Sequence, residues 1–311
     1  MLFSRIQLRS GNKDDLEHLI PEHREEAKRS NEERIRNIRV DRWISYARTE
    51  VVLARMRELV SYPPHDRMPA LLLYGATGMG KTKVLRKFTR NHPSSFDHQA
   101  GITRMQIVSM QMPPEPDERS FWAELLDALG SPINYGHTAL MMRRTARELL
   151  RFVEARVLII DELHALLAGS HRQQQILLNT LRLLASDLKL PLILAGTADA
   201  KRALMTDRQL ADRFQAVELP PWRNDEAYCR LLASYVAVLP LRRRSDLTSP
   251  AVRKALLDHT QGITVRLVRA IENLAIEAIR SGRECISQES LEALGAFPPL
   301  LSMEERSCVL A

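Results

Sequence analysis

The chain has 311 residues, 45% of them hydrophobic and 27% charged, which is usual for a globular protein with a sizeable core. Its 45 basic and 38 acidic residues leave a formal charge of +7, which permits contact with nucleic acid without establishing it. The three scattered cysteines argue against a disulfide framework or a zinc site, and no apolar run reaches the length of a membrane span, so we expect a cytoplasmic protein.

Residues 1–40 are rich in charges of both signs and are expected to form a charged amino-terminal arm or helix. From Asp41 onward, apolar residues recur at helical spacing, and the prolines at positions 63 and 64 end this predicted helix.

Between residues 70 and 222, continuous apolar segments alternate with amphipathic ones. The apolar segments predict strands over 70–75, 104–110, 156–161 and 191–196, and a last strand just before residue 222. The amphipathic segments predict helices over 81–91, 118–130, 138–155 and 173–188. Apolar strands that are each followed by a helix indicate an α/β fold, with a parallel sheet covered by helices on both faces.

Beyond residue 222 only helices are predicted, over 225–239, 249–260, 264–282 and 287–294. We therefore divide the chain into a charged arm (1–40), an α/β domain (41–222), a small all-helical lid (223–295) and a carboxyl-terminal tail (296–311).

The segment between the first predicted strand and the helix behind it matches G-x-x-x-x-G-K-[ST] in full. Its glycines let the loop curl until several backbone N–H groups point at one phosphate, and the helix N-terminus adds its positive end. We expect Lys81 to reach the β- and γ-phosphates of a nucleoside triphosphate and Thr82 to provide a magnesium ligand. The predicted nucleotide-binding residues of this loop are Gly75, Ala76, Thr77, Gly78, Met79, Gly80, Lys81 and Thr82.

A second apolar strand, "VLIID", ends in Asp161 and is followed by Glu162. At the carboxyl end of a strand, one carboxylate can hold the magnesium shell while its neighbour polarises an attacking water. We assign Asp161 to the metal, through water, and Glu162 to the general base. A small-molecule kinase needs no such base, so the pair favours hydrolysis, and no N-K-x-D motif follows the phosphate loop, which favours ATP over GTP.

Polar residues farther along the chain complete the candidate site. Thr197 follows a strand, where it would sense the γ-phosphate or position the water. Arg208 and Arg213 precede the last predicted strand, and either could reach the γ-phosphate of a neighbouring subunit. We favour Arg213, because the apolar Phe214 beside it would fix its position. Arg266 lies near the start of a lid helix, from which it could swing to the phosphates.

On these residues, the chain resembles the AAA+ ATPases, and most closely the TniB/TnsC family of transposition ATPases, which are related to the IstB helper and to replication initiators. The resemblance runs from about residue 40 to residue 285. It rests on an ordered set of blocks that includes "RMPALLLYGATGMGKT", "QMPPEPDERSFWAELLDALGSP", "VLIIDELHALLAGS", "DRQLADRF" and "LPPW". The phosphate loop is common to many families, whereas "DELHALLAGS" followed by "DRQLADRF" is far more specific.

The resemblance implies a bacterial ATPase that binds ATP and Mg²⁺ at subunit interfaces and assembles on duplex DNA as a homo-oligomeric ring or helical filament. It also implies two protein partners, a TniQ-like target-site adaptor and a DDE-type transposase. The matching positions make Thr197 a first sensor, Arg213 the arginine finger and Arg266 a second sensor. In this family the segment after the second strand faces DNA, so Arg119 and Thr138 are candidates for sequence-tolerant contacts with the DNA backbone.

One feature departs from the replication initiators, which usually place the lid arginine three residues after a glycine. Gly262 and Arg266 are four apart, which favours the transposition branch but weakens the second-sensor assignment. Arg119 also lies in the acidic run "PEPDERS", where it could instead pair with Glu115 or Asp117. The alternatives left open are a replicative helicase loader, a P-loop small-molecule kinase, and a switch that binds ATP and oligomerises with little turnover.

Overall fold

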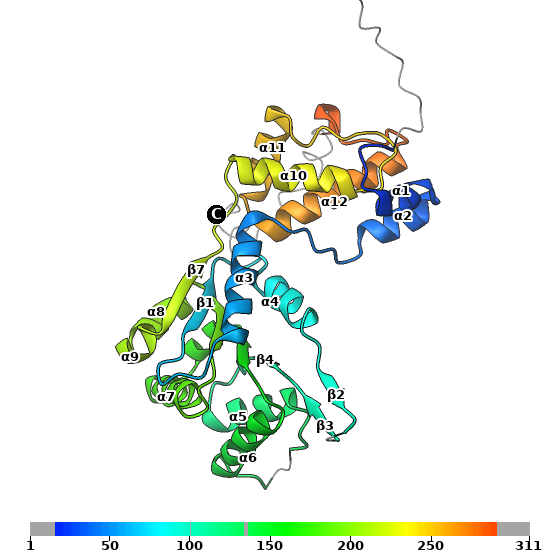
Figure 1. The fold of residues 1–311 in the computed structure, drawn as a ribbon. Coiled ribbons are helices and arrows are strands. Elements are labelled where there is room, and N and C mark those ends of the chain that lie inside the picture. Colours follow the sequence, from blue (N-terminus) through cyan, green and yellow to red (C-terminus); the bar gives the residue numbers. More distant parts are fainter. Residues whose placement is uncertain (1–15, 100, 134–135, 291–311) are drawn as a thin grey trace, which may run out of the picture. The chain divides into compact units, whose positions relative to one another are not determined.

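The computed structural model describes residues 16–99, 101–133 and 136–290, which form two compact units (Figure 1). One unit contains Ala47–Pro220, and the other combines the described residues before Ala47 (16–46) with those after Pro220 (221–290). The first part of the predicted arm, the second half of the predicted helix 287–294 and the predicted tail lie outside the described residues.

The α/β unit is built on a five-stranded sheet in the order β4-β5-β6-β1-β7. All of its strand pairs are parallel, which confirms the predicted fold class. The strands are β1 (Ala70–Tyr74), β4 (Ile107–Gln111), β5 (Val157–Asp161), β6 (Leu192–Gly196) and β7 (Phe214–Glu218). Strands β5 and β6 are buried along their whole length, as their continuous apolar sequences require.

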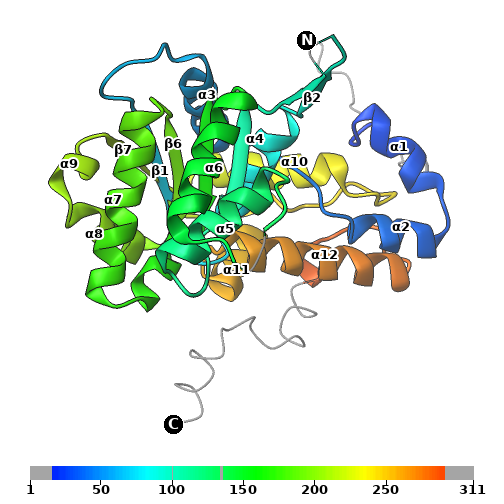
Figure 2. The same cartoon turned by 90° about the horizontal axis from the view of Figure 1, so that it is seen from below.

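Helices cover both faces of this sheet (Figure 1 and Figure 2). Leu72, Val108 and Ile160 point into a large apolar cluster with the helices on one face, and Leu71 is buried on the other. The helices of the unit are α3 (Ala47–Ser61), α4 (Lys81–Arg90), α5 (Glu118–Ala128), α6 (Ala139–Phe152), the 3₁₀ helix η1 (Leu163–Ala168), α7 (His171–Asp187), α8 (Ala198–Met205) and α9 (Arg208–Ala211).

Two short antiparallel strands, β2 (Ser95–Asp97) and β3 (Ile102–Arg104), form a separate sheet that the sequence patterns did not predict. Arg104, expected in the strand that became β4, instead belongs to β3. It forms ion pairs with Asp97 and Glu154, and β4 begins only at Ile107. The hairpin was missed because its strands are three residues long and carry little apolar surface.

The second unit is all helical. It contains α1 (Pro21–Lys28), α2 (Asn31–Ile38), α10 (Glu226–Val238), α11 (Pro250–Thr260), α12 (Thr264–Arg280) and the short 3₁₀ helix η2 (Gln288–Ser290). Ile38 of α2 lies in the same apolar cluster as Leu231 of α10 and Leu274 of α12. The expected charged arm is therefore, over its described part, two helices packed onto the carboxyl-terminal ones, of which α2 begins with a capping box formed by Ser30 and Glu33.

A buried ion pair joins the two ends of this helical unit. Arg34 of α2 is fully buried and donates two hydrogen bonds of 2.6 Å to the carboxylate of Glu284, 250 positions along the chain. The same guanidinium donates to the carbonyl of Pro240 at 3.1 Å.

A further difference from the sequence prediction concerns the helix expected from Asp41. It begins at Ala47, because Ile44 and Tyr46 pack against the apolar cluster of the helical unit. Within the described residues, no helix combines the length and the apolar composition needed to cross a membrane.

Candidate functional site

The glycine-rich loop connects β1 to α4 and is shaped by its glycines. Gly80 has φ 92° and directly precedes α4, in a conformation that other residues adopt only with strain. No side chain caps this helix, so its first backbone N–H groups stay available to an anion. Gly75 lies so close to the chain after β7 that an added Cβ would be 2.5 Å from the carbonyl oxygen of Leu219. The loop is therefore held against the chain that follows β7. The backbone N–H groups at the start of α4 have no side-chain cap.

Lys81 is the first residue of α4, and only 8% of it is exposed. Its Nζ donates to the carbonyl oxygens of Gly75 at 2.9 Å and Ala76 at 3.0 Å, so the ammonium lies within the loop itself. Burial lowers the pKa of Lys81, while the negative charges of Glu162 and Asp161 act against this shift. The ammonium of Lys81 therefore lies where the phosphate oxygens of a bound nucleotide would replace these two carbonyl oxygens as its hydrogen-bond acceptors.

Thr82 and Asp161 meet at the end of β5. The hydroxyl of Thr82 donates to Oδ2 of Asp161 at 2.6 Å, and Oδ1 of Asp161 accepts from the backbone N–H of Glu162 at 2.8 Å. A hydroxyl and a carboxylate side by side fit Mg²⁺, which prefers oxygen ligands and usually takes one or two protein groups together with phosphates and water. Among the described residues there is no group of three or more His, Cys, Asp and Glu that could hold a metal without a nucleotide.

Glu162 follows Asp161 with φ 55°, a left-handed conformation that is uncommon for a residue with a side chain. Such a conformation costs about 1–3 kcal/mol and persists only where its surroundings impose it. Oε2 of Glu162 lies 3.2 Å from Nδ1 of His164, although the geometry makes no hydrogen bond. The turn re-aims Glu162 away from the line of β5 and leaves its carboxylate half exposed.

Thr197 comes directly after β6 and begins α8. A threonine in this position usually accepts a hydrogen bond from the first turn of its helix, but Thr197 makes no such bond. Its buried Oγ1 has no hydrogen-bond partner among the described residues. Gly196 lets this strand end approach α8 and η1 closely, since an added Cβ would be 2.7 Å from Cβ of Ala200 and 3.3 Å from Cβ of Leu163. An unused hydroxyl therefore lies next to the turn that carries Glu162.

Arg213 lies away from these groups. Its carbonyl accepts from the backbone N–H of Ala70, at the beginning of β1, whereas the loop follows the end of β1. Its guanidinium donates to Oγ of Ser186 at 3.0 Å, near the end of α7. Arg213 therefore does not join the site of its own chain. Phe214 beside it is packed against the main apolar cluster, as expected.

Arg266 belongs to the helical unit and lies in the first turn of α12. Its Nη1 donates to Oε1 of Gln261 at 2.5 Å. Gly262, four residues earlier, has φ 68°, and an added Cβ would be 2.4 Å from the carbonyl oxygen of Trp222. The start of α12 is thus fixed against Trp222 within this unit.

Arg119 and Thr138, the candidates for DNA contact, are both exposed at the beginnings of helices. Thr138 caps α6 by accepting from the backbone N–H of Met141 at 3.3 Å. Glu118, next to Arg119, lies 3.8 Å from Arg143, so the first turn of α5 lies near the second turn of α6.

The model of a family described as "Bacterial TniB protein" matches residues 34–224, which is more than half of the chain. The chain belongs to the TniB family. No curated protein sequence matches it. Its fold is similar to those of ORC and Cdc6 proteins. The ORC2 protein of Aeropyrum pernix in ADPNP-ADP complexes has a TM-score of 0.59 and 17% identity, over 87% of this chain and 73% of that one. Cdc6p of Pyrobaculum aerophilum has a TM-score of 0.59 and 18% identity, over 86% of this chain and 72% of that one. Drosophila ORC bound to DNA has a TM-score of 0.54 and 14% identity, over 99% of this chain and 72% of that one.

These likenesses establish that the TniB-family chain has the AAA+ fold of the ORC and Cdc6 proteins. Its parallel sheet brings the phosphate loop, Asp161, Glu162 and Thr197 to the same end of the sheet. They all lie at or just after the carboxyl ends of the neighbouring strands β1, β5 and β6.

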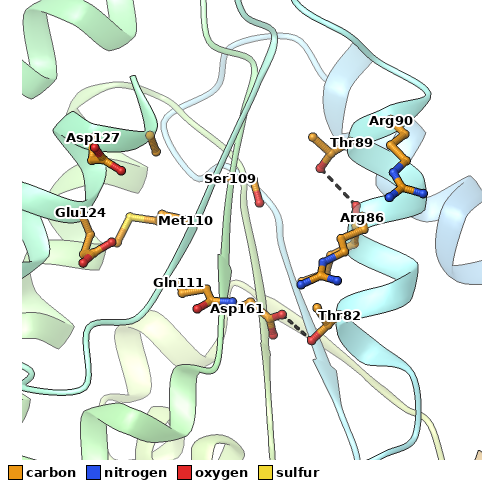
Figure 3. A pocket seen from close by; sticks show the side chains of 12 residues that line it. Thr82, Arg86, Thr89, Arg90, Ser109, Met110, Gln111, Glu124, Asp127 and Asp161 are labelled. Carbon is orange, nitrogen blue, oxygen red and sulfur yellow. Dashed lines mark hydrogen bonds between the residues drawn. The ribbon is translucent and has the colours of Figure 1, made fainter. Parts of the chain in front are cut away.

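Gln111 and His164 also lie at this end of the sheet, and sequence reasoning missed both. Gln111 ends β4 and pairs in register with Asp161. The predicted strand stopped one residue short of it, although polar residues at strand ends were the signal used elsewhere. His164 lies two residues after Glu162 and was passed over as part of a helix start. Figure 3 shows Gln111 beside Asp161 at one end of a cavity of about 440 Å³.

Proposed function

We propose that this TniB-family chain is a Mg²⁺-dependent ATPase that oligomerises on duplex DNA and regulates transposition. The observation that carries the ATPase is the meeting of three groups at one sheet edge. These are a buried lysine in a glycine-rich loop, a hydroxyl–carboxylate pair and an acid held in a left-handed turn. The titled ADPNP-ADP complexes of the similar ORC2 protein support nucleotide binding by the same fold.

Each group has a role in hydrolysis of ATP to ADP and phosphate. The ammonium of Lys81 and the N–H groups at the start of α4 bind the β- and γ-phosphates. Thr82 and, through water, Asp161 would hold Mg²⁺, which would neutralise charge on the phosphates. Glu162 accepts a proton from the water that attacks the γ-phosphorus, and Thr197 offers its free hydroxyl to the γ-phosphate or to that water. In this proposal Arg266 acts as a second sensor.

Oligomerisation would supply a further cation, the guanidinium of Arg213 from a neighbouring protomer. Because Arg213 lies at the other end of the strands from its own loop, it would act on the γ-phosphate of a neighbouring protomer. A cation supplied in this way stabilises the charge of the transition state. ATP would then join protomers to one another, and the assembly would exist only while nucleotide occupies the interface.

Duplex DNA is the polyanion that we propose for this assembly. The formal charge of +7 favours a polyanion, and Arg119 and Thr138 are exposed at the starts of α5 and α6. A similar fold, Drosophila ORC, is titled as bound to DNA. Contacts to phosphates position an assembly without reading bases, so binding should tolerate any sequence and weaken with salt. Membership of the TniB family supports a link between a TniQ-like adaptor and a DDE-type transposase.

Electron microscopy of the full chain with duplex DNA, Mg²⁺ and a non-hydrolysable ATP analogue tests this proposal. We expect rings or helical filaments around the duplex, which disappear without nucleotide and in the Lys81→Ala variant. A solitary protein under all of these conditions would reject the proposal, and a solitary protein that phosphorylates a small molecule would identify a kinase. Assemblies that form on a replicative helicase rather than on DNA would identify a helicase loader.

A further inference from the structure

The cavity beside Thr82 and Asp161 continues away from the phosphate loop as a groove along the edge of the sheet. It is lined on one side by α4, at its floor by β4 and on the other side by α5 (Figure 3). None of the roles proposed for the ATPase uses this part of the molecule.

The floor of the groove is an edge strand with an open side. Strand β4 stands last in the strand order and, among the described residues, pairs only with β5. The backbone N–H of Val157 donates to the carbonyl of Gln106 at 3.0 Å, and that of Met112 donates to Asp161 at 2.9 Å. Residues that bond to a neighbouring strand alternate with residues whose backbone groups point the other way. Ser109 and Gln111, both exposed, therefore direct their N–H and C=O groups to the open side.

The two walls of the groove carry opposite charges. Arg86 and Arg90 project from α4, and Glu124 and Asp127 project from α5, all four with exposed side chains. Over the described part of the chain, none of the four side chains forms an ion pair or a hydrogen bond. Two arginines four residues apart, and two acids three residues apart, repel one another on their own helices. Asp127 also lies in the last turn of α5, where the helix dipole disfavours a carboxylate.

We propose that this groove binds an extended segment of a partner protein, which adds to β4 as a further strand. Successive side chains of a strand point to opposite faces, so one set would face α4 and the other α5. The segment that fits has acidic residues opposite Arg86 and Arg90 and basic residues opposite Glu124 and Asp127. Nucleic acid fits less well, because the acidic wall repels phosphates. This inference is independent of ATP hydrolysis, since none of the four charged residues is assigned to the nucleotide.

The probe is an octapeptide of alternating glutamate and lysine, added at millimolar concentration to the full chain. One control has four glutamates followed by four lysines, and another is the alternating peptide with every amide N-methylated, which removes the N–H donors from both edges of the peptide without changing its charge. Hydrogen exchange of residues 107–111 and fluorescence anisotropy of labelled peptide are measured together. We expect only the unmodified alternating peptide to slow exchange, by at least about tenfold at the amides of Ser109 and Gln111.

Charge-reversal variants on α4 and α5 test the two charged walls of the groove. Arg90→Glu and Asp127→Lys should each weaken binding of the alternating peptide at least about fivefold, as loss of a rim charge pair plus new repulsion predicts. Lys87→Glu, the same charge change on α4 outside the groove, should leave binding unchanged. Absence of protection by the alternating peptide, or equal protection by the N-methylated peptide, would overturn the proposal. So would an Arg90→Glu variant that binds duplex DNA more weakly and the peptide as before, because the groove would then be a nucleic-acid surface.

Discussion

The hydroxyl of Thr82 and the carboxylate of Asp161 are 2.6 Å apart, although 79 positions separate them in the chain. One residue lies in the first turn of α4, which follows β1, and the other ends β5; both strands pair in parallel with β6, so their carboxyl ends lie at the same end of the sheet. The contact supports a site assembled from strand ends.

Glu162→Gln tests the proposed general base. The amide keeps the shape of the side chain but cannot accept the proton of water, so turnover should fall by about 10²–10⁴-fold while nucleotide binding persists. ATP hydrolysis and binding of a fluorescent ATP analogue are measured on the same protein. Glu148→Gln, an exposed acid on α6, is the matched control and should hydrolyse at the original rate. Normal turnover in Glu162→Gln would remove Glu162 from the mechanism.

Thr197→Val separates activity from stability. The buried Oγ1 of Thr197 has no hydrogen-bond partner among the described residues, so an isosteric valine should leave the melting temperature equal or slightly higher. Hydrolysis should nevertheless fall by at least about tenfold if the hydroxyl contacts the γ-phosphate or the water. Thr145→Val, an exposed position on α6, should change neither quantity. A destabilised Thr197→Val protein, or one with full activity, would contradict the assignment.

Mixing two inactive variants tests whether Arg213 acts across an interface. Arg213→Ala lacks the finger and Lys81→Ala lacks the phosphate site, so each alone should be inactive. In an equal mixture, about a quarter of interfaces combine an intact site with an intact finger, and a comparable share of the activity should return. Ser186→Ala, which removes only the partner that Arg213 has in its own chain, should remain active. No recovery in mixtures that are shown to co-assemble would exclude a finger in trans.

The ion pair between Arg34 and Glu284 makes the helical unit sensitive to acid. Burial alone would raise the pKa of Glu284, but hydrogen bonds from Arg34 and from the backbone of Arg242 outweigh it and lower the pKa below 4.5. The stabilisation is thus complete above pH 4.5 and is lost as pH falls through the lower native value. Arg34→Ala, which removes the closer of the two arginines that pair with this largely buried carboxylate, should cost about 3–5 kcal/mol.

Unfolding measured between pH 7 and pH 3 by circular dichroism checks this dependence. The double variant Arg34→Met, Glu284→Leu should lose much of the acid sensitivity at a smaller cost than Arg34→Ala. Glu226→Gln, which breaks an exposed pair with Arg230, should have little effect at any pH. An acid transition that is identical in the original protein and the double variant would show that another group controls it.

The sequence predicted the parallel sheet and the residues at its edge because both depend on local patterns. Apolar strands such as β5 and the glycine-rich loop have the same signature in any context. Packing between distant segments has no such signature. The charges around Arg34 looked like those of a solvated helix, yet Arg34 is fully buried against a residue near the other end of the chain. Gln111 was missed because an exposed edge strand need not end where its apolar residues do.

The order of the chain has a consequence for its synthesis. Helices α1 and α2 leave the ribosome first, but Glu284 follows Arg34 by 250 residues, with the whole α/β unit in between. At bacterial elongation rates this interval is on the order of 10–50 s. The α/β unit can fold during translation, whereas the amino-terminal helices must wait with Ile38 uncovered until α12 emerges. Nascent chains stalled before α12 should therefore be the species that needs protection by a chaperone.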